Sequence, residues 1–300
     1  MAKVTWSLAT DPNDPIFNGG YVVSSHNRLR LNGRRLLTLP PWIVLHIPHN
    51  STLIPANVRD QFTLSDAELN DEIKKMTDHH TQDLFGQGVN SSQIVAAPVS
   101  RLVVDVERFE DDALEPMSGV GMGVVYTRTH DSKTLRRPIS QEEREALLDD
   151  WYRPHHLRLS NAVENAIKCH GRCLIIDCHS FPQKALPYEN SPDAVRPDIC
   201  IGTDEYHTPN QLADWLVKSI RRSGRSVSLN SPFSGSLVPL GYYHLDKRVE
   251  SVMIEVRRDI YIDEDTQIWI PGTFEATQEK IRVAIAGYCG IFESKGSPDV

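Results

Sequence analysis

The chain has 300 residues, of which 40% are hydrophobic and 24% charged, so it carries enough apolar residues to bury a substantial core. Its formal net charge of −8 argues against a nucleic-acid surface, which needs a concentrated basic patch. No stretch approaches the roughly 18 apolar residues of a membrane span, and the first residues are too polar for a signal peptide, so we expect a cytoplasmic protein without a membrane partner.

The first half of the chain mixes strand and helix signals after an N-terminal arm that we expect to be irregular over residues 1–40. Residues 42–47, WIVLHI, are continuously apolar, as in a strand buried on both faces. Ser65 and Glu68 form a capping box, which predicts that a helix begins there. Further apolar stretches predict short strands at residues 94–99, 102–107 and 124–129.

The second half continues this alternation. Ser140 and Glu143 form a second capping box, which opens a long amphipathic helix that Pro154 should kink or split. Thr208 and Pro209 predict the N-cap and the first residue of a helix that runs to about residue 224. Apolar runs predict strands at residues 173–178, 198–203 and 251–262, followed by a helix over 273–294. The alternation indicates one α/β domain, residues 1–300, built as a three-layer sandwich around a mainly parallel mixed sheet.

Polar side chains stand at the ends of these predicted strands, where open α/β sheets bind their ligands. His49 and His179 each follow an apolar strand, and Glu255 lies within the last one. Two histidines and one carboxylate are a usual ligand set for catalytic zinc, and a glutamate outside that set can act as the base. Arg101 and Arg108 flank residues 102–107 and have the fork geometry that matches a carboxylate. This pattern fits a metal-assisted amide hydrolase that acts on a small acidic substrate.

Nine short motifs then resemble a known family when they are taken in order. They are IPHNSTLIP (47–55), DHHTQDLF (78–85), SRLVVDVER (100–108), GVGMGVVYTRT (119–129), RPHHLRL (153–159), DCHS (177–180), RPDICIGT (196–203), NSPFSG (230–235) and IEVRRDIY (254–261). The ordered set looks like the N-formylglutamate amidohydrolase family over about residues 42–262. The resemblance implies a fold similar to zinc carboxypeptidases and aspartoacylase. It also implies hydrolysis of N-formyl-L-glutamate to formate and L-glutamate, a late step of histidine degradation.

The resemblance also implies a metal centre with one zinc ion, Zn²⁺. Its metal ligands would be His49, His179 and an acid of the DHHTQDLF motif, for which Asp78 is chosen and Asp83 is the open alternative. Glu255 would be the catalytic base and later the proton donor to the amine.

The remaining implied roles concern the substrate. Arg101 and Arg108 would hold substrate carboxylates, and Arg108 would also stabilise the oxyanion. Asn230 would line the substrate pocket. Ser180 is expected at the substrate as well and, with Asp177, is placed to orient His179. His46 and the pair His155-His156 are expected to pack or to support neighbouring ligands.

One departure from the family pattern concerns Glu107, which stands where the family usually has Asn. A carboxylate there would repel an acidic substrate unless it turned away or paired with an arginine. Two alternatives to N-formylglutamate hydrolysis therefore stay open. One is a metallohydrolase of the same family that acts on another N-acyl amino acid or a short peptide. The other is a relative that binds a metal or a ligand without catalysis. The oligomeric state is left open.

Overall fold

The N-terminal residues form a small sheet of their own. The structure, a computed structural model, describes residues 22–24, 28–31, 34–37, 39–189 and 195–295, and the chain divides into two compact units, Met1–Thr38 and Leu39–Val300. In the first unit, β1 (Val22–Ser24), β2 (Arg28–Leu31) and β3 (Arg34–Leu37) pair as an antiparallel sheet in that order. The described part of the expected irregular arm thus forms strands. The alternation RLRL in β2 is a period-two signal that was available in the sequence.

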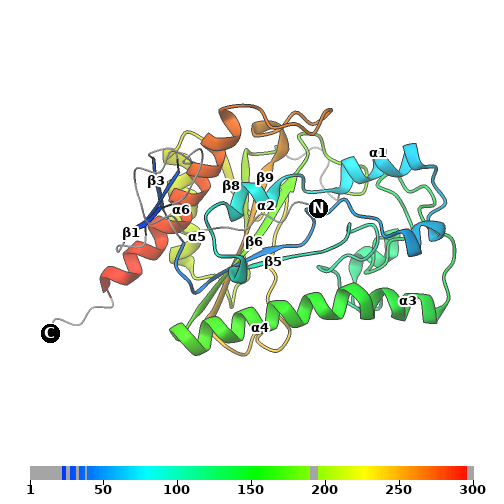
Figure 1. Ribbon diagram of the computed structural model, residues 1–300, viewed down its shortest axis with the longest axis horizontal. Helices are drawn as coiled ribbons and strands as arrows, with labels where there is room; N and C mark the ends of the chain where they lie inside the picture. Colours follow the sequence, from blue (N-terminus) through cyan, green and yellow to red (C-terminus); the bar gives the residue numbers. More distant parts are fainter. Residues whose placement is uncertain (1–21, 25–27, 32–33, 38, 190–194, 296–300) are drawn as a thin grey trace. The chain divides into compact units, whose positions relative to one another are not determined.

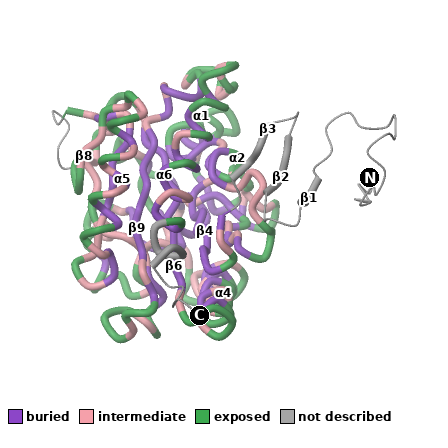
Figure 2. Tube along the Cα trace, turned by 90° about the vertical axis from the view of Figure 1, so that its left-hand side faces the viewer, coloured by how far each residue is buried: buried purple, intermediate pink, exposed green. Residues whose placement is uncertain are grey.

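The second unit is built on one mixed sheet of six strands, in the order β5-β4-β6-β9-β7-β8. Their bounds are β4 (Ile43–Ile47), β5 (Ile94–Ala96), β6 (Cys173–Phe181), β7 (Ile199–Gly202), β8 (Val227–Leu229) and β9 (Val249–Arg257). Every neighbouring pair is parallel except β7 with β9, which is antiparallel. The mainly parallel mixed sheet expected from the sequence is confirmed, and its central strands are buried along their length (Figure 2).

Helices cover both faces of this sheet, as Figure 1 shows. On one face lie α2 (Thr81–Gly86), α5 (Asn210–Arg222) and α6 (Thr273–Lys295), while α4 (Arg153–His170) packs on the other face against β4, β5 and β6. Alternate strand residues such as Ile43, Leu45 and Ile254 point into the core under α5 and α6. Val44 and Ile175 point to the α4 side. This alternation decides which polar side chains can share one face.

The two capping boxes are present. Ser65 and Glu68 open α1 (Asp66–Met76), and Ser140 and Glu143 open α3 (Gln141–Leu147). The long helix expected after Ser140 continues from α3 through a π-helical turn, Leu148–Tyr152, into α4, with Pro154 in the first turn of α4. The wider π turn precedes the proline, whose missing N–H cannot join the ladder.

The other helices differ in small ways from their predicted limits. α5 begins one residue later than predicted, with Pro209 at the N-cap, because the Thr208 hydroxyl turns inward and donates to the Ser251 carbonyl. Short 3-10 helices cover Ala56–Gln61, Ser91–Gln93, Pro116–Val120 and Arg258–Ile260. Within the described residues, none of the helices has the length and apolar character needed to cross a membrane.

Two predicted strands, residues 102–107 and 124–129, are wrong. Both segments are irregular, and their buried apolar residues pack in a second apolar cluster with Leu147 and Leu148, while Thr127 and Arg128 are exposed. The buried guanidinium of Arg136 donates to the carbonyls of Leu102, Val103 and Tyr126, so side-chain hydrogen bonds replace a strand ladder. The predicted strand 251–262 also ends early, since β9 stops at Arg257 and a 3-10 turn follows.

Candidate active site

Three neighbouring strands, β4, β6 and β9, bring the predicted polar residues to the α4 side of the sheet. His179 in β6 and Glu255 in β9 are direct neighbours in the parallel register. His46 in β4 is likewise the register partner of Asp177 in β6. Because Cys178 between the two β6 residues faces the opposite core, both Asp177 and His179 point to the same side.

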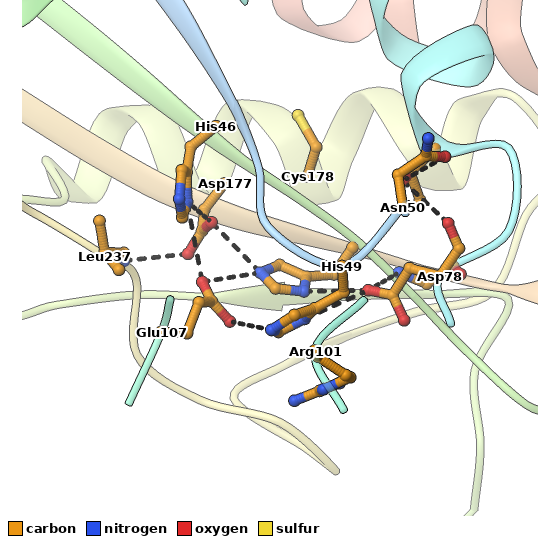
Figure 3. A network of polar contacts seen from close by, with 12 residues as sticks. His46, His49, Asn50, Asp78, Arg101, Glu107, Asp177, Cys178 and Leu237 are labelled. Carbon is orange, nitrogen blue, oxygen red and sulfur yellow. Dashed lines mark hydrogen bonds and ion pairs between the residues drawn. The ribbon is translucent and has the colours of Figure 1, made fainter. Parts of the chain in front are cut away.

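Asp78 lies beside both predicted histidine ligands, and Figure 3 shows it next to His49. Its Oδ2 is 3.1 Å from Nδ1 of His179 and 3.7 Å from Nδ1 of His49, and the two imidazole centroids are 5.1 Å apart. The Ser180 amide donates to the same oxygen at 3.2 Å, and Arg258 donates to Oδ1 at 3.3 Å. Burial alone would raise the pKa of Asp78, but its hydrogen bond with His179 and the closeness of the His49 ring hold that pKa well below its usual range. The side chains of residues 49, 78 and 179 therefore converge.

The alternative acid, Asp83, lies elsewhere. Its side chain is 55% exposed in α2 and contacts His80 at 3.3 Å. The structure thus brings Asp78 to the two histidines and leaves Asp83 on the surface.

Other carboxylates face the opposite, Nε2 ends of the two imidazoles. Asp105 Oδ1 is 2.8 Å from Nε2 of His49. Glu107 Oε1 and Asp177 Oδ1 are 3.0 and 3.2 Å from Nε2 of His179. Glu107 therefore does not turn away, and its neighbours are imidazoles where the sequence had suggested an arginine.

The hydrogen bonds indicate which end of the His49 ring is available to a metal ion. Burial opposes ionisation of Asp105, but the charges of Arg101, His49 and Arg108 together with the hydrogen bond from His49 outweigh it and hold the pKa of Asp105 well below its usual range. An ionised carboxylate only accepts, so His49 donates from Nε2, and its neutral ring, the form that binds a metal ion, has its lone pair on Nδ1. That Nδ1 is buried and has no hydrogen-bond partner among the described residues. A carboxylate behind a histidine is the usual arrangement for a metal ligand.

A second arrangement of possible ligands involves Glu107. One ligand atom each from His49, Glu107 and His179 lies within 4.8 Å of the others, and the same holds for His46, Glu107 and Asp177. A metal ion bound to Nε2 of His49 would have to displace the 2.8 Å contact with Asp105. A metal ion at the Nδ1 end, with Asp78, would leave the contact of His49 with Asp105 in place. Among the described residues both three-ligand groups within 4.8 Å contain Glu107 and neither contains Asp78, so this arrangement requires the side chains of His49, Asp78 and His179 to move closer together.

Glu255 stands beside the converging side chains as a carboxyl without a hydrogen-bond partner on Oε2 among the described residues. It is 7% exposed. Burial and the nearby charges of Asp78 and Glu107 raise its pKa to about 8, against the opposing effect of the two histidines. A cation held next to it would lower this pKa, since a bound metal is the largest local charge in such a site.

A cavity of about 390 Å³ opens over these residues and is lined by three arginines. Arg101 is committed to Asp105, to which its Nη2 donates at 2.8 Å, and to the Tyr126 hydroxyl. Arg108 is less engaged, because its buried Nε has no hydrogen-bond partner among the described residues and its carboxylate neighbours Asp105 and Glu115 are 3.6 and 3.7 Å away. Arg108 is therefore the guanidinium with hydrogen-bonding capacity left for a ligand.

The other two predicted substrate residues differ in position. Ser180 lines the cavity, where its hydroxyl accepts a hydrogen bond from Arg258. Asn230 lies outside the cavity lining on an exposed loop, and its side chain bridges to the Thr203 amide and hydroxyl.

Sequence reasoning gave no role to Asp105 and Arg258, although both fall in motifs that the resemblance rests on. Asp105 lies in SRLVVDVER and Arg258 in IEVRRDIY. Both are buried charged residues, at 0% and 4% exposure, and each touches one of the converging side chains. An acid or arginine within a strongly apolar segment was the available signal, because such residues are rarely buried without a partner.

Known proteins resemble this chain in sequence and in fold. An N-formylglutamate deformylase of Pseudomonas putida is 26% identical over 230 residues, which cover 74% of this chain and 82% of that protein. The crystal structure of an N-formylglutamate amidohydrolase from Ralstonia eutropha JMP134 matches with a TM-score of 0.70 at 20% identity, covering 84% of this chain and 95% of that one. A gene product of Agrobacterium tumefaciens matches with a TM-score of 0.62 at 19% identity, over 84% and 92% of the two chains.

The match to a family model shows to which family this chain belongs. The model described as N-formylglutamate amidohydrolase matches residues 42–262, which include every strand of the six-stranded sheet and all the converging side chains. The α/β fold expected from the resemblance is confirmed by the sheet topology and by the solved structures. The chain belongs to the N-formylglutamate amidohydrolase family.

Proposed function

We propose that this protein is a metal-dependent amidohydrolase that cleaves N-formyl-L-glutamate into formate and L-glutamate. The observation that supports this most is the convergence of His49, Asp78 and His179 next to Glu255 on a cavity that also exposes Arg108. The Pseudomonas putida relative carries the name of an N-formylglutamate deformylase.

The site fits one divalent ion, for which we propose zinc. The buried, unpartnered Nδ1 of His49 and the neighbouring Nδ1 of His179 and Oδ2 of Asp78 are the donors that would hold it. When bound, the ion supplies Lewis-acid chemistry at the acyl oxygen and makes water acidic enough to ionise near neutral pH.

Glu255 moves the proton in this proposal. Its Oε2 takes a proton from the attacking water as the new carbon–oxygen bond forms at the formyl carbon. The same carboxyl then gives that proton to the amide nitrogen as the carbon–nitrogen bond breaks. The products are formate and L-glutamate, whose amino group is now free. Arg108 holds a substrate carboxylate through its fork of donors and steadies the oxyanion, while Arg101 keeps Asp105 against His49.

Glu107 supports a second candidate substrate range. Its carboxylate lines the cavity and adds negative charge where an acidic substrate would bind. N-acyl amino acids with less charge, or short peptides, would meet less repulsion there. Zinc-loaded protein would be assayed with N-formylglutamate, N-formylaspartate, N-acetylglutamate and dipeptides.

The deciding test is formate release from N-formylglutamate, measured together with metal content. Wild-type protein should hold one zinc per chain and prefer N-formylglutamate, and His179→Ala should lose both metal and turnover. Equal zinc in the variant and the parent would remove the ligand assignment. Zinc-loaded wild type that binds acyl amino acids and hydrolyses none would favour a non-catalytic binding protein.

A further inference from the structure

A buried chain of hydrogen bonds runs from helix α4 to the imidazole of His179. His155 in α4 places its Nε2 2.9 Å from Nε2 of His46, and Nδ1 of His46 is 2.8 Å from Oδ1 of Asp177. The same oxygen of Asp177 is 3.2 Å from Nε2 of His179. His46 and His155 are both 0% exposed, so water does not compete for these contacts. Figure 3 shows His46 and Asp177 side by side in this chain.

The donors and acceptors in this chain can be assigned from its acidic end. Asp177 accepts from the Leu237 amide at 3.0 Å and, as a carboxylate, also accepts from His46. With a neutral ring, His46 donates from Nδ1 and accepts at Nε2, and His155 then donates from Nε2. The Nδ1 of His155 has no hydrogen-bond partner among the described residues, which leaves the contact with His46 as the anchor of the ring. Burying such a polar ring costs stability that an apolar side chain would not.

A second side chain of the same helical run reaches the substrate side of the site. Tyr152, three residues before His155, donates from its hydroxyl to the Arg108 carbonyl at 2.8 Å. Tyr152 ends the π-helical turn Leu148–Tyr152, and α4 begins at the next residue. A π turn shifts the phase of a helix and often marks a functional site. Tyr152 and His155 are three residues apart in this helical run and therefore lie on one face of it.

We infer that the start of α4 is a positioning element for the active site. His155, acting through His46 and Asp177, fixes the ring of His179, and Tyr152 fixes the backbone that carries Arg108. The inference rests on the proposed function, because His179 is a metal ligand and Arg108 a substrate anchor only in that proposal. Neither Tyr152 nor His155 belongs to the cavity lining, so both act through other residues.

Substitutions of His155 and of Tyr152 should change different measured quantities. His155→Leu should weaken zinc affinity and lower kcat with little change in KM. Because His155 acts through His46 and Asp177, the effect should be smaller than the roughly 10- to 100-fold range of a direct partner of a metal ligand. His155→Gln, which can place an amide donor near the position of Nε2, should restore most of both. Tyr152→Phe removes the hydroxyl that fixes the backbone of Arg108. It should raise KM for N-formylglutamate and, because Arg108 also steadies the oxyanion, lower kcat, while zinc affinity stays near the wild-type value.

Zinc affinity, measured by competition with a chelator, separates this inference from the proposed substrate. If wild type binds zinc but releases no formate, the proposed function fails. The positioning role of His155 can then still be tested, because it predicts a change in zinc affinity. Val163→Ala is the matched control, because Val163 is a fully buried residue of α4 that lies in the apolar cluster under the helix. The inference is overturned if His155→Leu and Val163→Ala, compared at equal loss of thermal stability, lower zinc affinity equally. It is also overturned if His155→Gln behaves as His155→Leu.

Discussion

Asp78 and Glu107 lie at opposite ends of the imidazole of His179. Oδ2 of Asp78 is 3.1 Å from Nδ1, and Oε1 of Glu107 is 3.0 Å from Nε2. Only one of these ends can hold the metal ion, because the other nitrogen of a ligating histidine usually donates to a carboxylate or carbonyl. In the proposed metal centre the 2.8 Å contact of Asp105 with Nε2 of His49 stays in place, and the ion binds at the Asp78 end.

Two charge-neutralising variants test which end of the His179 ring binds the metal ion. Asp78→Asn should remove stoichiometric zinc and lower formate release by more than about 100-fold, because it removes a ligand rather than a supporting group. Glu107→Gln should keep one zinc per chain and change its affinity by at most about 10- to 100-fold. Metal analysis after gel filtration and the formate assay measure both effects. Retained zinc in Asp78→Asn with loss in Glu107→Gln would reverse the assignment.

Of Arg101 and Arg108, only Arg108 should affect KM. Arg108→Lys keeps the charge but removes the fork, so KM for N-formylglutamate should rise by roughly 10- to 150-fold, the equivalent of losing about 1.5–3 kcal/mol, and kcat should fall as well because Arg108 also steadies the oxyanion. Arg101→Lys should mainly lower kcat, because Arg101 holds Asp105 and thereby orients His49. Steady-state kinetics on both variants check this. Equal changes in KM for both would show that Arg101 also binds the substrate.

Arg258 should be important for the stability of the metal-free protein. It is 4% exposed, donates to Asp78 and to the carbonyls of Lys75 and Ser180, and leaves a buried carboxylate without its cation when removed. Arg258→Met should lower the free energy of unfolding by about 3–5 kcal/mol in chelator-treated protein. Zinc should reduce this difference, since the ion supplies positive charge to Asp78. Urea unfolding with and without zinc measures it, and an unchanged difference would place the metal away from Asp78.

The raised pKa of Glu255 predicts a pH dependence of stability for the metal-free protein. Its pKa is about 8 in the folded state against 4.5 for an ordinary glutamate, so the folded state binds more protons between these values. Stability should therefore fall as pH rises from about 5 to 8. Glu255→Gln should lack this part of the slope, and Glu279→Gln, at an exposed position of α6, serves as the control for losing one charge. Identical slopes in wild type and Glu255→Gln would contradict the shifted pKa.

Much of the fold was predictable from local patterns. The continuous apolar runs predicted β4 and β6, and the capping boxes at Ser65 and Ser140 marked the starts of α1 and α3. The failures at residues 102–107 and 124–129 have one cause. A buried apolar segment has the sequence pattern of a strand. Here, however, the carbonyls of Leu102 and Val103 accept hydrogen bonds from Arg136, which is more than 30 residues away in the sequence. Tertiary hydrogen bonds of this kind leave no local signal.

The residues of the site that follow apolar strands or lie in the family's motifs could be predicted from the sequence. His49 and His179 followed apolar strands, and the structure places Asp78 between them. The partners of their far nitrogens, Asp105 and Glu107, could not be assigned because they sit on an irregular segment whose path depends on packing. Asn230 was expected in the pocket but hydrogen-bonds with Thr203 outside the lining, and its substrate role stays a prediction.

The most direct measurement is anomalous diffraction at the zinc absorption edge from crystals of zinc-loaded protein. We predict one peak roughly 2.0–2.2 Å from Nδ1 of His49, Nδ1 of His179 and a carboxylate oxygen of Asp78, with Glu255 beside it. A peak at the Nε2 ends next to Glu107, or no peak shared by the two histidines, would contradict the proposed metal centre.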